Sequence, residues 1–171
     1  EFAAFEGVRW LGTSIASLTQ LQRALVVGSN LRKEHPLFAQ RIRQAVRKGA
    51  ALSVITSAGL MADRDAWAIS VAQSTIAEAG QWVEALAAVA AAIGKTNGAT
   101  APLAPRNEPD AAAQAIAASL LGGERKAILL GNAAAHHAEA SSLLALANWI
   151  GAQTGATVGY LTEAANTVGA Q

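Results

Sequence analysis

Residues 23–56 predict one strand–turn–helix–strand unit, and this unit constrains the fold more than any other part of the chain. An apolar run ends in a glycine at residues 23–28, an amphipathic stretch follows at residues 36–48, and a second apolar run fills residues 50–56. Two buried runs on either side of a helix are typical of parallel strands joined by a crossover. The unit therefore predicts an α/β fold.

The residues after the first predicted strand are candidate cofactor-binding residues. In parallel sheets ligands gather where strands end and helices begin, which is the place of Gly28, Ser29 and Asn30. Their backbone N–H groups could approach a phosphate, or the glycine could simply allow a tight exit from a buried strand. A dinucleotide site commonly uses a carboxylate after the second strand, but the nearest acid here is Asp63. We therefore expect a vestigial site.

The second half of the chain repeats the strand–glycine–helix scheme. We expect residues 1–171 to form a single α/β domain, with a Rossmann-like parallel sheet of about five strands and helices on both faces. The predicted strands lie near Ala24–Gly28, Leu52–Thr56, Trp67–Ala72, Ala127–Gly131 and Thr157–Leu161. A stretch with several glycines and prolines, residues 94–107, reads as a linker between the two halves.

One predicted helix is apolar on several sides. It runs from about His136 to Thr154, and Trp149 lies on a different side of it from Leu143. A helix of this kind is usually covered by more than one neighbour. We therefore expect an interface on this helix or on the N-terminal segment, where the aromatic residues are Phe2, Phe5 and Trp10.

Composition excludes several classes of function. The chain has no cysteine, which excludes disulfides, a thiol nucleophile and a cysteine-ligated iron–sulfur cluster within it. A net charge of +1 gives no general attraction to nucleic acid or to an anionic membrane. The neighbouring His136 and His137 would point about 100° apart on a helix and cannot chelate one ion together. We expect no metal, no nucleic acid and no direct membrane insertion.

Several motifs together resemble the molybdopterin oxidoreductase superfamily. They are the run Leu25-Val-Val-Gly-Ser-Asn30, the pair His35-Pro36, the segment Arg41-Ile-Arg43, the run Gly49-Ala-x-Leu-x-Val-Ile55 and the later run Ile128-Leu-Leu-Gly-Asn132. Within that superfamily the chain is most similar to the C-terminal, molybdopterin oxidoreductase-like part of the 75 kDa-type subunit family of bacterial respiratory complex I, the NADH-quinone oxidoreductase. Residues 5–12 and 161–169 also resemble that family.

The resemblance implies a non-catalytic structural domain in a complex that passes electrons from NADH to quinone. It implies no cofactor in this chain, with iron–sulfur clusters elsewhere in the parent subunit. The implied partners are the remainder of its own subunit and neighbouring peripheral-arm subunits of complex I. The implied location is the cytoplasmic side of the inner membrane, as part of a membrane-associated complex. Because the chain opens at Glu1 without a methionine, we expect it to be a piece of a longer protein.

The chain also departs from the pattern of active superfamily members. Leu31 stands where they usually have a proline after Gly-Ser-Asn, and residues 56–58 replace the usual acid-Pro-Arg. The alanine run at residues 133–135 offers no side chain that could grip a phosphate. Two alternatives remain open: a cofactor-binding fragment of an active molybdopterin oxidoreductase, and a stand-alone nucleotide-binding module.

Overall fold

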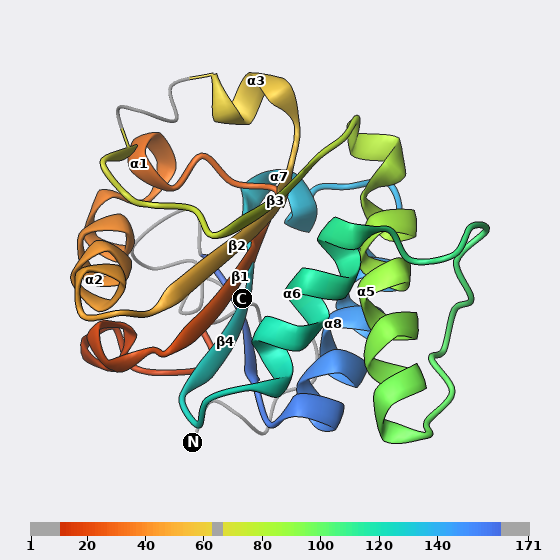
Figure 1. Ribbon diagram of the computed structural model, residues 1–171. Helices are drawn as coiled ribbons and strands as arrows, with labels where there is room; N and C mark the ends of the chain where they lie inside the picture. The colour runs from red at the N-terminus through yellow and green to blue at the C-terminus, as the bar shows by residue number, and fades with distance from the viewer. Residues whose placement is uncertain (1–10, 63–66, 162–171) are drawn as a thin grey trace.

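A computed structural model describes residues 11–62 and 67–161, and within these ranges the chain forms an α/β fold around one parallel sheet (Figure 1). The sheet has five strands in the order β3-β2-β1-β4-β5, and every pairing is parallel. The strands are β1 Arg23–Val27, β2 Ala51–Thr56, β3 Gln73–Ile76, β4 Lys126–Leu130 and β5 Thr157–Tyr160. The predicted Rossmann-like fold is confirmed.

Helices cover both faces of the sheet. The helices α1 and α2 lie on one face, while α5, α6 and α8 lie together on the other (Figure 1). The helical segments are η2 Ala16–Gln20, α1 Leu31–Glu34, α2 Pro36–Arg47, α3 Ala58–Met61, η3 Ala79–Gln81, α5 Trp82–Asn97, α6 Ala111–Leu121, α7 Asn132–Ala135 and α8 Ala140–Thr154. Within the described ranges, no helix combines the length and the apolar character that crossing a bilayer requires.

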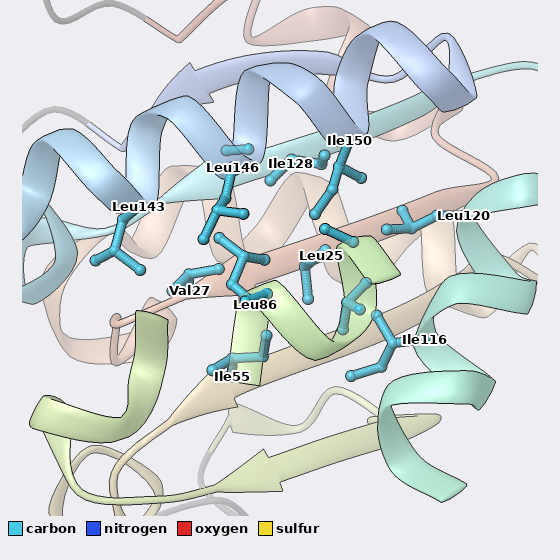
Figure 2. Packing of buried hydrophobic residues seen from close by; sticks show 14 of the residues in the cluster. Leu25, Val27, Ile55, Leu86, Ile116, Leu120, Ile128, Leu143, Leu146 and Ile150 are labelled. Carbon is cyan, nitrogen blue, oxygen red and sulfur yellow. The ribbon is translucent and has the colours of Figure 1, made fainter. Parts of the chain in front are cut away.

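The two faces of the sheet bury two separate apolar clusters. Leu25 and Val27 of β1 point into the larger cluster, which α5, α6 and α8 complete, whereas Ala24 and Val26 point into the other. Figure 2 shows Leu25 and Val27 facing helix residues such as Leu146. A strand covered on both faces needs an uninterrupted apolar run, because successive side chains point to opposite sides. This is why β1 and β4 can be identified from the sequence.

Local signals set several helix ends. Pro36 occupies the first turn of α2, where its missing N–H costs no hydrogen bond. The Asp110 carboxylate accepts a hydrogen bond of 2.7 Å from Ala113 N and so caps α6. At the end of α8, Gly155 takes a φ of 74°, the left-handed conformation that glycine adopts most easily.

The predicted third strand is wrong in position. We expected it at Trp67–Ala72, but β3 is Gln73–Ile76, and Ala72 N donates the hydrogen bond that begins the pairing, to Leu52 O at 2.8 Å. Ala68 has a φ of 50°, which interrupts an extended backbone. The buried side chains of Trp67 and Ile69 pack into the second cluster from the segment before β3, where the backbone is helical at Trp67, so their alternation does not mark a strand.

The predicted helix from His136 to Thr154 is also corrected. α8 begins only at Ala140, and its apolar sides contact both the sheet and α5. Trp149 is half-buried, and its ring lies near Gly94 of α5. Of the described residues, the exposed large apolar side chains are Ile15, Leu37, Ile76 and Leu103, and none of them belongs to α8. Leu144 and Trp149 are only partly buried, and the expected interface on this helix or on the N-terminal segment stays a prediction.

Two further expectations have different outcomes. The predicted linker begins later than residue 94, because α5 continues to Asn97. The aromatic residues Phe2, Phe5 and Trp10, which we expected to contribute to an interface, lie outside the described residues.

Candidate functional site

The candidate site lies at the topological switch point of the sheet, between β1 and β4. From β1 the strands β2 and β3 follow on one side, and β4 and β5 follow on the other. β1 pairs with β2 on one side and with β4 on the other. The chain leaves β1 toward α2 on one face of the sheet and leaves β4 toward α8 on the opposite face (Figure 1). In open α/β sheets the crevice between two such loops is the usual place for a ligand. The predicted residues Gly28, Ser29 and Asn30 form the first of these loops.

Gly28 is closely covered by the protein itself. It has a φ of 62°, and its N–H donates a hydrogen bond of 2.9 Å to Ile55 O. A Cβ at this position would lie 2.7 Å from Cζ3 of Trp82 and 2.8 Å from the backbone nitrogen of Ala134. Glycine is therefore required for backbone conformation and for space, and the space beside it is filled by an indole ring and by α7.

The side chains of Ser29 and Asn30 are both used within the loop. Ser29 is 1% exposed, and its Oγ donates a hydrogen bond of 2.7 Å to Oε2 of Glu34. Asn30 is 4% exposed, and its Oδ1 accepts a hydrogen bond of 3.1 Å from Lys33 N at the start of α1. Both groups therefore stabilise the turn from β1 into α1.

Two backbone N–H groups of the segment after β4 donate to carbonyl oxygens at the end of β1 and just after it. Gly131 N donates to Val27 O at 2.8 Å, and Ala133 N donates to Gly28 O at 3.1 Å. A Cβ on Gly131 would collide with the Cβ of Ser29 and with Gly28 O. The segments after β1 and β4 thus contact each other directly, and two N–H groups at this strand–helix junction, those of Gly131 and Ala133, are paired with carbonyl oxygens and not available to an anion.

Trp82 and His137 cover this junction from the side of α5. The indole is 1% exposed, its Nε1 donates to Ala77 O at 3.1 Å, and it stacks on His137 with ring centroids 5.8 Å apart. His137 Nδ1 accepts from Glu139 N at 2.9 Å, which leaves Nε2 to donate to Ala79 O at 2.9 Å. His137 therefore links the start of α8 to η3, which precedes α5.

Sequence reasoning missed these covering residues. Trp82 is an apolar residue in the sequence, but nothing local indicates that its ring reaches Gly28, 54 positions earlier in the sequence. Glu34 lies near Ser29 in the sequence, so a short-range side-chain hydrogen bond was a signal that could have been found. His136 and His137 were judged together for metal binding, while a structural role for His137 was overlooked.

His35 is the titratable group whose environment is most unusual. Its side chain is 3% exposed and stacks on Phe38 with ring centroids 5.6 Å apart. Burial lowers the pKa of the imidazole below its ordinary value of 6.5, and the Glu34 carboxylate, 3.8 Å from Nε2, opposes this in part. Nε2 has no hydrogen-bond partner among the described residues. A neutral buried imidazole whose Nε2 is unbonded, at the residue that precedes α2, fits a structural place at a helix entry more than a catalytic base.

The end of β2 offers no carboxylate to a ribose. Thr56 occupies the last position of β2, is 1% exposed, and its Oγ1 finds no hydrogen-bond partner within the described part of the chain. Asp63, the nearest acid that follows, lies outside the described residues. Among residues 11–62 and 67–161, no three side chains of the His, Cys, Asp and Glu types come close enough to hold a metal ion.

The sequence matches a known protein family over almost its whole length. The family model described as molybdopterin oxidoreductase matches residues 3–171. No curated protein matches the sequence.

Proposed function

The chain belongs to the molybdopterin oxidoreductase family, and on this premise we propose that it is a structural domain that keeps the family's scaffold without binding its cofactor. The parent protein is then an oxidoreductase in which this domain packs and positions its neighbours. The proposal depends on one observation, which is that the two loops at the switch point are filled by each other and by Trp82.

The residues at this junction do not fit a pyrophosphate. Such a group is held by backbone N–H donors and by glycines that let the backbone approach it. Gly131 N already donates to the carbonyl oxygen of Val27 at the end of β1, Ala133 N donates to that of Gly28, and Gly28 is covered by an indole ring. Ser29 and Asn30 bond within their own turn. We therefore derive no catalytic step through a molybdopterin cofactor in this chain.

The energy needed to open this junction supports the same proposal. Breaking two backbone hydrogen bonds and moving a buried indole aside costs about 4 kcal/mol, a factor of roughly 10³ in affinity. A dinucleotide would have to supply that energy in addition to its ordinary cost of binding.

We propose, more specifically, that the parent is the 75 kDa-type subunit of a bacterial NADH–quinone oxidoreductase, respiratory complex I. The motifs at residues 25–30, 35–36, 41–43 and 49–55 support this assignment through their resemblance to that family. In this proposal the parent complex transfers electrons from NADH to quinone through iron–sulfur clusters outside this chain. The domain contacts the remainder of its own subunit and neighbouring peripheral-arm subunits, on the cytoplasmic side of the inner membrane.

A calorimetric titration tests the loss of the cofactor. Guanosine nucleotides and molybdopterin guanine dinucleotide are added to the purified chain, and we expect no saturable heat in the micromolar range. Elemental analysis of the same sample is expected to find no stoichiometric molybdenum or iron. A clear micromolar isotherm would instead favour the rival function, a cofactor-binding fragment of an active molybdopterin oxidoreductase. That rival is favoured by the family match over residues 3–171.

A second experiment tests the proposed parent. The chain carries an affinity tag in the cell from which it comes, and its partners are identified after mild extraction of the membranes. Recovery of peripheral-arm subunits of complex I is the expected result. Recovery of a molybdenum enzyme, or of the chain alone in the soluble fraction, would contradict the assignment.

A further inference from the structure

A hollow of about 590 Å³ lies at the amino-terminal ends of β1 and β4, at the other end of these strands from the candidate site. Three cationic side chains line it: Arg23 at the start of β1, Lys48 just after α2 and Arg125 just before β4. These residues come from segments far apart in the sequence, which the parallel sheet brings together near the lower end of β4 in Figure 1.

The described residues that line the hollow carry positive charge and no negative charge. None of the described residues that line it has a carboxylate. Within residues 11–62 and 67–161, the side chains of Arg23, Lys48 and Arg125 form no ion pair. Three like charges around one concave surface repel one another, and an anion placed between them would relieve that repulsion.

Both guanidinium groups are held in position by backbone carbonyl groups. Nη1 of Arg23 donates to Gln22 O at 2.8 Å, and Nε of Arg125 donates to Gln20 O at 2.7 Å. A guanidinium has five N–H donors, so each arginine keeps others for a ligand. Because the groups are already oriented, less side-chain entropy is lost when they bind.

The walls of the hollow are tied together and leave room for a ligand. Oε1 of Gln22 accepts hydrogen bonds from Glu124 N at 2.6 Å and from Arg125 N at 3.3 Å, which joins the segments before β1 and β4. The segment after α2 forms the remaining wall, and a Cβ placed there on Gly49 would meet no atom within 4 Å, so the space beside it is open.

We propose that this hollow binds a small, multiply charged oxyanion of the phosphate or pyrophosphate class. Its volume lies in the range of small-ligand sites, and planar guanidinium groups match phosphate oxygens well. Leu21 is the one large apolar side chain among its described lining residues, so the apolar anchors of a protein interface are missing. No described aromatic ring lines it for a base to stack on.

The cations have an alternative, structural role that the test must separate from binding. α2 and α6 both end beside the hollow, and positive side chains stabilise the negative end of a helix. A purely structural role predicts that removing a charge lowers stability without any effect on a ligand. The proposal predicts an effect on affinity.

The test is a calorimetric titration of the whole chain with sodium pyrophosphate, and separately with inorganic phosphate, at low ionic strength. We expect saturable binding, tighter for pyrophosphate, that weakens as salt is added. Arg125→Gln should weaken it at least about tenfold, as expected for one charge-assisted hydrogen bond. The matched control is Arg47→Gln, which removes the same charge from an exposed position outside the hollow and should leave the affinity unchanged.

Three outcomes would overturn the proposal. They are no binding at low salt, equal weakening by Arg125→Gln and Arg47→Gln, and tighter binding of an acidic peptide than of pyrophosphate. Amide NMR shifts of the unmodified chain supply a readout that needs no variant, and we expect the largest shifts at Gln22, Gly49 and Gly123. Shifts centred on Gly28 and Gly131 would contradict the proposed loss of the cofactor cradle. The absence of shifts at Gln22, Gly49 and Gly123 would overturn this site alone, so the two proposals can fail separately.

Discussion

Replacing Trp82 with alanine should be one of the most destabilising single changes in this chain. The indole is 1% exposed, stacks on His137, donates to Ala77 O and lies against Gly28. Truncating a buried tryptophan costs about 3–5 kcal/mol, and an unpaired carbonyl adds about 1 kcal/mol. We therefore expect Trp82→Ala to lose about 4–6 kcal/mol, a large share of the roughly 5–15 kcal/mol that stabilises a typical domain.

Two further variants separate the contributions. Trp82→Phe keeps an aromatic ring in the same place but removes the N–H that bonds to Ala77 O, so it should lose about 1–2 kcal/mol. Trp149→Ala is the control of matched chemistry, because that side chain is only half-buried; it should lose about half as much as Trp82→Ala. The assay is urea unfolding followed by far-ultraviolet circular dichroism. If Trp82→Ala and Trp149→Ala lose equal stability, the reasoning about the covered junction is wrong.

Three more changes test other parts of the fold. Gly28→Ala should lose about 2–4 kcal/mol in urea unfolding, because it adds a clash with Trp82 to the strain of a positive φ. Gly155→Ala should show the strain alone, about 1 kcal/mol, since no atom lies near its added Cβ. Equal losses in the two variants would contradict the packing argument. Asp110→Ala should lose about 1 kcal/mol by removing the cap of α6, and Asp110→Asn should restore most of it in thermal unfolding. Burial lowers the pKa of His35 in the folded state, so the unfolded chain binds a proton at this residue more readily as pH falls below 6.5, and stability should decline below that pH. In His35→Gln this part of the decline should vanish from melting curves measured between pH 7 and 5. An unchanged slope of stability against pH in the variant would refute the argument.

The sequence by itself determines the parallel sheet and several helix ends. Continuous apolar runs at residues 23–28 and 126–131 identify strands covered on both faces, since only such strands need apolar side chains in both directions. Pro36 and Asp110 mark helix starts because their effect is local and needs no distant partner. The turn at Gly28, Ser29 and Asn30 was also located correctly between β1 and α1, although its proposed vestigial character stays a prediction.

Only the tertiary structure decided where β3 lies and what fills the switch point. β3 is a half-buried edge strand with polar residues, so it lacks the apolar signal that Trp67 and Ile69 provide a few residues earlier, outside any strand. The contact of Trp82 with Gly28 joins segments that are neighbours only after the helices have packed on the sheet. Such contacts depend on the direction and reach of side chains across a folded core, and a pattern of residue types along the chain does not contain that information.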